Sequence, residues 1–114
     1  MLFTDRTTQT VEWALKAQAE RQRVVAHNIA NVNTPGFRAT KLEFEQSLAT
    51  ALGRTNGGTA RAERSATNDP VSLNGNNVSL EKELEALDKS NIHYEALTSA
   101  LTSKFSQLRT AIGR

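Results

Sequence analysis

The sequence contains no cysteine, only two prolines and few aromatic residues. The absence of cysteine excludes disulfides, thiolate metal ligands and thiol nucleophiles, but it is compatible with both cytosolic and periplasmic destinations. No apolar run approaches the ~20 residues that cross a bilayer, and the N-terminus lacks the basic and apolar regions of a cleaved signal peptide. With 38% hydrophobic residues among 114, the chain can form one domain with a modest core.

Charge and motif content also argue against several classes of function. The 14 basic and 12 acidic residues are mixed along the chain, whereas a nucleic-acid-binding protein concentrates Lys and Arg on one face. The sequence has no HExxH motif, no paired carboxylates at ligand spacing and no nucleophile beside a base. His27 and His93 are therefore interpreted as packing or surface residues. We predict no catalytic residue, no metal site and no cofactor, and hence no enzyme.

The dominant positive feature is an apolar pattern in the last third of the chain. Steps of 4 and 3 residues from Leu80 to Ile112 meet an apolar or aromatic residue at eight of ten positions, without Gly or Pro. This spacing predicts a helix of roughly 50 Å whose narrow stripe must be covered by another helix. Ser79 is its expected N-cap. We call this stripe the C-terminal seam: Leu80, Leu84, Leu87, Asn91, Tyr94, Thr98, Leu101, Phe105, Leu108 and Ile112.

Two polar positions interrupt the C-terminal seam and leave two interpretations open. Asn91 and Thr98 either specify register and partner number, or the seam rotates so that Leu97 replaces Thr98. Both interpretations concern assembly.

Residues 1–34 also lack Gly and Pro and predict a second long helix. The same stepping places Val11, Leu15, Val25 and Ile29 on its apolar stripe, the N-terminal seam. Gln18 and Gln22 fall in the middle of this seam, where they are either buried hydrogen-bonding positions or solvent-facing ones. Trp13 lies off the seam, so it is expected at a rim or against a neighbouring subunit.

The middle of the chain is expected to connect these helices. Pro35 and Gly36 predict a type II turn that ends the first helix. Phe44, Leu48 and Leu52 have helical spacing, which predicts a short helix over 41–52. Residues 53–79 hold four of the six glycines and few apolar residues, so we expect a flexible loop.

Together these patterns predict an all-α fold, in which two long helices form an antiparallel coiled-coil hairpin. Residues 1–34 and 80–114 would make one discontinuous helical domain, and residues 35–79 would supply the turn, the short helix and the loop. A seam longer than its intramolecular cover should leave the monomer partly disordered, folding on assembly.

The segment from His27 to Phe37, His-Asn-Ile-Ala-Asn-Val-Asn-Thr-Pro-Gly-Phe, resembles the N-terminal signature of the bacterial flagellar rod and hook family. The family likewise ends in a heptad helix, and residues 73–83, 91–94 and 104–112 resemble its proximal-rod members. The resemblance implies a structural subunit of the proximal rod, assembled helically into the axial drive shaft. The turn residues that match the family motif are Asn28, Asn31, Thr34, Pro35, Gly36 and Phe37.

The resemblance also implies a location and a set of partners. Such proteins pass through the type III export gate without a cleaved signal peptide and lie in the basal body, in the rod that crosses the periplasm. The expected partners are further copies of the chain, rod subunits similar to FlgC and FlgF, the adaptor FliE, the MS ring and the export gate. The residues expected to pack against subunits are Val11, Leu15, Val25, Ile29, Leu80, Leu84, Leu87, Tyr94, Leu101, Phe105, Leu108 and Ile112.

Two alternatives remain at the level of sequence. One is another rod subunit of the same family, similar to FlgC. The other is a cytosolic helical adaptor or chaperone that binds partner helices in discrete complexes.

Overall fold

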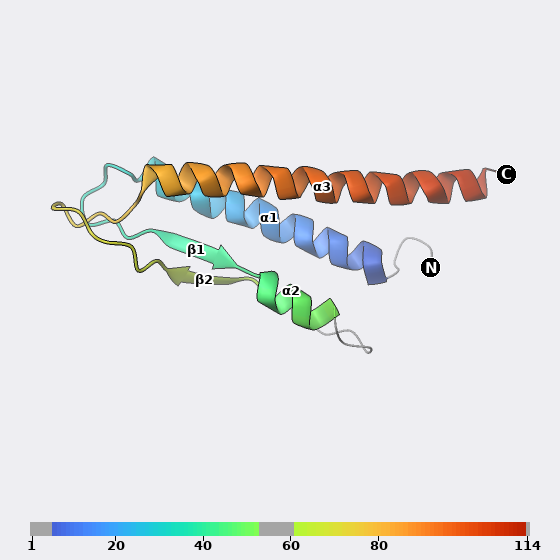
Figure 1. The fold of residues 1–114 in the computed structure, drawn as a ribbon, viewed down its shortest axis with the longest axis horizontal. Helices are drawn as coiled ribbons and strands as arrows, with labels where there is room; N and C mark the ends of the chain where they lie inside the picture. The colour runs from blue at the N-terminus through green and yellow to red at the C-terminus, as the bar shows by residue number, and fades with distance from the viewer. Residues whose placement is uncertain (1–5, 53–60, 114) are drawn as a thin grey trace.

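A computed structural model describes residues 6–52 and 61–113 of the chain. The elements are helix α1 (Arg6–Ala30), strand β1 (Thr40–Glu43), helix α2 (Glu45–Leu52), strand β2 (Glu63–Ala66) and helix α3 (Leu80–Ile112). The molecule is elongated, with principal extents of 65 × 28 × 14 Å. Figure 1 shows α1 lying between α3 on one side and the two strands on the other.

Helix α3 runs from Leu80 to Ile112, the span predicted from the C-terminal seam. Ser79 caps it by accepting a hydrogen bond from the Lys82 N–H at 3.4 Å, and Glu81 and Glu83 in the first turn complement the helix dipole. The 33-residue α3 is longer than the 25-residue α1. In Figure 1 the two helices are closest near the turn, separate toward the start of α1, and α3 extends past that start.

The buried apolar side chains come from α1 and from the segment around β1, and those of α3 are at most half-buried. Along α3 the buried residues are Glu83 and Ser90, both polar. The buried hydrophobic side chains among the described residues come from α1 and from the segment around β1: Ala14, Ala17, Val24, Val25, Ala39, Leu42 and Phe44. The fully buried residues of α3 are therefore polar, whereas α1 and the segment around β1 contribute the buried hydrophobic side chains.

The prediction of a purely α-helical fold is wrong in one respect. Strands β1 and β2 pair antiparallel, with Thr40 opposite Ala66 and Glu43 opposite Glu63. The short helix begins at Glu45 rather than at Lys41, because Thr40–Glu43 is extended and buries only Leu42 against the core. Trp13, expected at a rim or on a neighbouring subunit, packs edge-on against Phe44 at 5.5 Å.

The expected flexible loop is also partly wrong. Its residues 53–60 lie outside the described part of the chain, but residues 63–66 form β2 and residues 72–77 form an ordered hydrogen-bonded turn. Asn76 and Asn77 are only 4% and 3% exposed. Composition missed this order because the segment is fixed by amide hydrogen bonds, not by apolar burial.

Candidate assembly interface

The turn after α1 has the geometry that its Pro-Gly pair predicts. Gly36 has φ +76°, and the Phe37 N–H donates to the Thr34 carbonyl at 3.2 Å, closing a four-residue turn. A positive φ at the residue that follows Pro is the type II pattern. Thr34 N–H in turn donates to the Asn31 carbonyl at 3.0 Å. The turn redirects the chain from the end of α1 into β1.

Asn28 joins three elements at the end of α1 and is completely buried. Its Nδ2 donates to the Thr40 carbonyl at 2.7 Å and to Glu83 Oε1 at 2.9 Å. Its Oδ1 accepts from the Thr40 N–H at 3.2 Å. One amide side chain thus ties α1 to the outer edge of β1 and to the first turn of α3.

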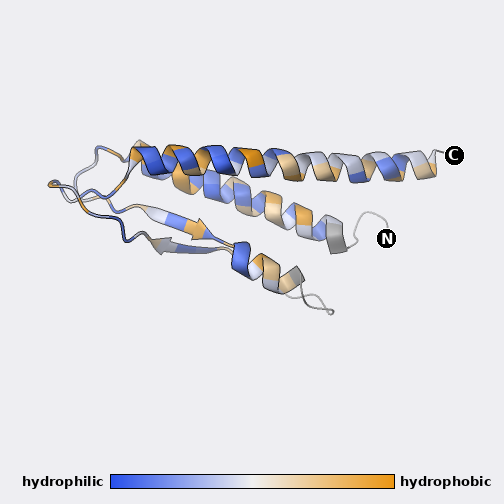
Figure 2. Ribbon diagram, viewed as in Figure 1, coloured by the Kyte–Doolittle hydropathy of each residue, from blue (hydrophilic) through white to orange (hydrophobic). Residues whose placement is uncertain are grey.

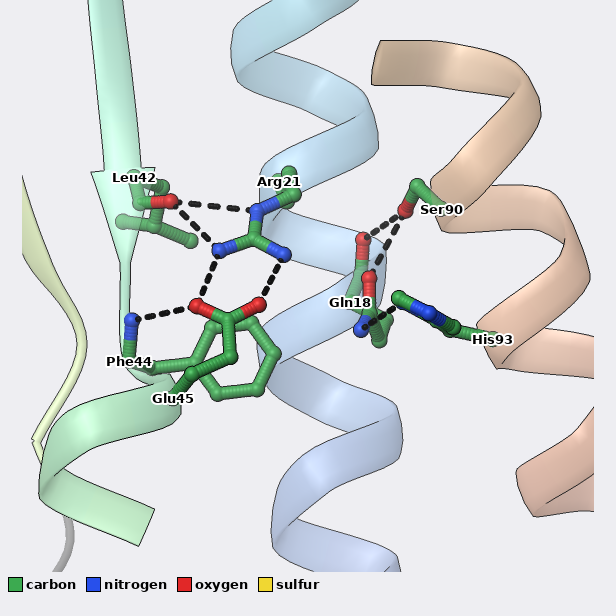
Figure 3. Close-up of polar contacts among 7 residues, drawn as sticks. All are labelled: Gln18, Arg21, Leu42, Phe44, Glu45, Ser90 and His93. Atoms are coloured by element: carbon green, nitrogen blue, oxygen red, sulfur yellow. Dashed lines mark hydrogen bonds and ion pairs between the residues drawn. The ribbon is translucent and has the colours of Figure 1, made fainter. Parts of the chain in front are cut away.

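Arg21 makes a second connection between α1 and the ribbon, drawn in Figure 3. Its guanidinium pairs with both carboxylate oxygens of Glu45, at 2.5 and 2.7 Å, and also donates to the Leu42 carbonyl at 2.8 and 3.1 Å. It lies 4.5 Å from the centroid of the Phe44 ring. The hydrogen bond from Arg21 holds the pKa of Glu45 at about 2, below its ordinary 4.5. This forked geometry fixes the start of α2 against α1.

A weaker group of charges lies nearby on the exposed side of the ribbon. Glu20 is bound by Arg23 on its own helix and by Arg64 on β2. The hydrogen bond from Arg23 is the largest influence that lowers the pKa of Glu20. These contacts are exposed, so they orient the ribbon more than they stabilise it.

The contact between α1 and α3 is polar in its middle, as Figure 3 shows for Gln18. Ser90 Oγ donates to Gln18 Oε1 at 2.8 Å, and Gln18 Nε2 lies 3.5 Å from His93 Nδ1. Gln22 Nε2 donates to Asn91 Oδ1 at 2.7 Å. Gln18 is therefore a buried hydrogen-bonding position, one of the two interpretations that the sequence left open.

The residues predicted to pack against subunits fall into two groups. Val25 is buried, and Val11, Leu15, Ile29, Leu87, Leu101 and Leu108 are half-buried. The others stand on the surface of α3, and their exposed fractions are 44% for Leu80, 47% for Leu84, 38% for Tyr94 and Phe105, and 62% for Ile112. Figure 2 shows apolar bands recurring along α3 to its C-terminal end. One side of the C-terminal seam therefore remains open to solvent.

Face geometry explains this division. Glu83, Ser90 and Leu97 are among the less exposed positions of α3 and repeat at intervals of 7 residues beside the C-terminal seam. Helix α1 covers this neighbouring stripe, since Gln18 satisfies Ser90 and Asn28 satisfies Glu83. Apolar spacing cannot identify a stripe whose buried members are polar, which is why the covered face was missed.

Sequence reasoning also missed the amides that hold the turn. Asn76 Nδ2 donates to the carbonyls of Asn31 and Thr34, each at 2.8 Å. Asn77 Oδ1 accepts from the Ala39 N–H at 2.6 Å. The available sequence feature was the run Asn74-Gly75-Asn76-Asn77, since asparagines beside a glycine commonly bond to nearby backbone in turns.

The described residues show no cluster of three or more His, Asp or Glu side chains placed to hold a metal ion. Among the helices described, none combines the length and apolar character needed to cross a membrane.

Comparison with known proteins gives consistent matches. The family described as "Flagella basal body rod protein" matches residues 9–38, which include most of α1 and the Pro-Gly turn. The flagellar basal body rod protein FlgB of Bacillus subtilis is 31% identical over 119 residues, covering 93% of this chain and 92% of the relative. FlgB of Cereibacter sphaeroides is 32% identical, covering 87% and 88%. FlgB of Escherichia coli is 26% identical, covering 87% of each.

Proposed function

The chain belongs to the FlgB family of flagellar basal-body rod proteins, and from this premise we propose that it assembles helically in the proximal rod. It is a structural subunit of the basal-body rod. The names of its relatives favour this position over that of a subunit similar to FlgC, and over a cytosolic adaptor or chaperone. We expect no catalytic activity.

The observation that carries the assembly proposal is the open side of the C-terminal seam. Leu80, Leu84, Tyr94 and Ile112 are spaced for a helix–helix contact and stand on the surface of α3. A row of exposed apolar side chains of this kind supports a role as an interaction surface. Helices of neighbouring rod subunits would cover it, with the half-buried Val11, Leu15 and Ile29 of the N-terminal seam contributing, while Val25 is already buried within the chain.

The remaining parts of the proposal follow from family membership. The subunit would pass the type III export gate without a cleaved signal peptide and cross the periplasm as part of the rod. Its neighbours would be copies of itself, rod subunits similar to FlgC and FlgF, the adaptor FliE and the MS ring. The family-motif turn, Asn28 to Phe37, would set the angle between the axial helix and the outer ribbon.

An in-frame deletion of the gene, followed by electron microscopy of isolated basal bodies, tests the proposal. The expected mutant keeps the membrane-embedded ring but lacks rod, hook and filament. Complete flagella in the deletion mutant would contradict a rod function and would return attention to a cytosolic adaptor.

Complementation then tests the seam with two matched variants of α3. Leu84→Ser removes an exposed apolar side chain on the C-terminal seam, and Ile92→Ser removes one that is 65% exposed and outside the seam. Because both sites are exposed, each purified variant should unfold within about 0.5 kcal/mol of the parent. Only Leu84→Ser should fail to restore rods. Equal complementation by both variants would show that the open seam is not an assembly surface.

A further inference from the structure

The family-motif turn depends on a segment about 40 residues further along the chain. Its own backbone bonds include those from the Thr34 N–H to the Asn31 carbonyl and from the Phe37 N–H to the Thr34 carbonyl. Four further backbone groups of the turn, the Gly36 N–H and the carbonyls of Asn31, Thr34 and Phe37, bond to the segment 74–77. The Gly36 N–H donates to the Asn74 carbonyl at 2.9 Å, and the Asn77 N–H donates to the Phe37 carbonyl at 3.2 Å.

Side chains of the same segment complete the contact. Asn76 Nδ2 donates to the Asn31 and Thr34 carbonyls, and Asn77 Oδ1 accepts from the Ala39 N–H. Both asparagines are buried, at 4% and 3% exposure. If the segment left, these backbone groups would exchange their hydrogen bonds to it for bonds to water, and each intramolecular hydrogen bond contributes about 0.5–1.5 kcal/mol net.

The two backbones also touch directly through glycines. Gly75 has φ +85°, and a Cβ built on it would lie 3.2 Å from Gly36 Cα. Gly36 itself has φ +76°. Both positions therefore need the left-handed backbone that glycine adopts without strain, and Gly75 also needs the absence of a side chain.

The segment leads at once into α3. Ser79 caps the helix, and Glu83 in its first turn accepts from the buried Asn28 at the end of α1. Docking of residues 74–77 on the turn and docking of Glu83 on Asn28 thus share one short stretch of backbone. Formation of either contact therefore fixes most of the backbone that the other contact needs.

We propose that residues 74–77 act as a latch on the family-motif turn. The turn closes only when this segment docks, and the end of α1 and the start of α3 then fold as one cooperative unit. Because the N-terminal residues are synthesised first, the turn of the family motif cannot close until the chain has been synthesised as far as residue 83. The latch concerns the chain in solution and stands independently of the proposed rod assembly.

Amide hydrogen exchange in the full-length chain, read by NMR, tests the latch with Asn76→Asp. This isosteric change removes the two Nδ2 donors but keeps the Oδ1 that accepts from the Val78 N–H. Exchange at Gly36 and Phe37 should accelerate by at least about tenfold. The amides of Val32, just beyond the end of α1, and of Glu83, in the first turn of α3, should accelerate with them.

Two further variants complete the test. Asn33→Asp adds the same charge at an exposed position of the turn and should leave these four amides unchanged. Gly75→Ala strains the backbone at φ +85° and crowds Gly36 Cα, which would lie 3.2 Å from the new Cβ, so it should reproduce the Asn76→Asp pattern. If Asn76→Asp also accelerates exchange of the amides around Ala17 in mid-α1, the variant destabilises the whole fold. In that case the exchange pattern of Gly75→Ala is used to test the latch. The proposal would be overturned if the Gly36 amide stayed protected in Gly75→Ala. It would also be overturned if the Gly36 amide were unprotected in the parent chain.

Discussion

Asn28, Asn76 and Asn77 each present a donor and an acceptor on one short side chain, and each bonds to backbone groups of another element. Apolar side chains could fill the same space, but they could not satisfy the buried carbonyls and N–H groups of an irregular turn. Asn28 could be selected from the sequence because it belongs to the family motif. The run Asn74-Gly75-Asn76-Asn77 marks Asn76 and Asn77 as turn residues, but nothing local shows that their partners lie some 40 residues earlier.

Asn28→Asp should destabilise the protein by about 3 kcal/mol at neutral pH. The change removes both Nδ2 donors and places a buried carboxylate against the Glu83 carboxylate and the Thr40 carbonyl. Urea unfolding measures the loss. Acidification should restore part of it, because the introduced carboxyl group, once protonated, can again donate to Glu83. The exposed Asn33→Asp serves as control, and equal stability of the two variants would contradict the role of Asn28.

Glu45 should make the stability of the protein depend on acid. Its folded-state pKa of about 2 lies below its ordinary 4.5, so the ionised form favours the folded state. This contribution is complete above pH 4.5 and is lost as the pH falls toward 2. Because the Glu45 side chain is 57% exposed, solvent limits the effect to about 1 kcal/mol.

Comparison with Glu45→Gln isolates this contribution from other titrating groups. The variant should be less stable than the parent at neutral pH, and the difference in free energy of unfolding should shrink between pH 4.5 and 2. A difference that stays constant over this range would exclude the Arg21–Glu45 ion pair as its source.

At the scale of elements, α3 was predictable and the ribbon was not. Ser79, an unbroken apolar repeat and Gly113 define the limits of α3 locally, so the span from Leu80 to Ile112 followed from the sequence. Strand β2 has no buried residue. Strand β1 is held by side chains of α1, since Arg21 and Asn28 bond to its outer backbone edge at Leu42 and Thr40. Such tertiary contacts leave no periodicity in the strand itself.

Gly36→Val should impair rod assembly more than expression. A β-branched residue at φ +76° is strained, at a cost of about 1–2 kcal/mol, and would open the turn between α1 and β1. Swimming in soft agar and electron microscopy of basal bodies measure assembly, and immunoblotting measures the amount of protein. Among the described residues, none lies within 4 Å of a Cβ built at Gly36, so conformation alone causes the effect.

Gly36→Asn is the matched control, because asparagine tolerates the left-handed region. It should retain most motility. Pro35→Ala, which frees φ at the preceding position, should fall between the two. Full motility of Gly36→Val would remove the turn geometry from the assembly proposal.

At the scale of the whole molecule, the hydrophobic core gathers at the ribbon side of α1, while α3 contributes polar contacts along its inner half. Asn28–Glu83, Gln18–Ser90 and Gln22–Asn91 hold α3 to α1 from the turn to about Asn91. Beyond this point α3 separates from α1 and then extends past it (Figure 1). The sequence predicted a long helix in need of cover, but polar pairing decided which part is covered within the monomer.

This arrangement predicts an uneven stability along α3 in the isolated chain. Amides of the inner half, from Glu83 to Ser90, should exchange with the cooperative unit that includes Asn28. Amides of the outer half, from Leu101 to Ile112, should exchange at least about tenfold faster, because the end of α3 extends past α1 (Figure 1) and frays more readily. Thermal unfolding followed by circular dichroism should accordingly be broad, and assembly with partner subunits should slow exchange in the outer half. A single, sharp and concentration-independent transition, with uniform protection along α3, would mean that the helix is stable without cover. The prediction that α3 becomes fully ordered only when other subunits cover the C-terminal seam would then be wrong.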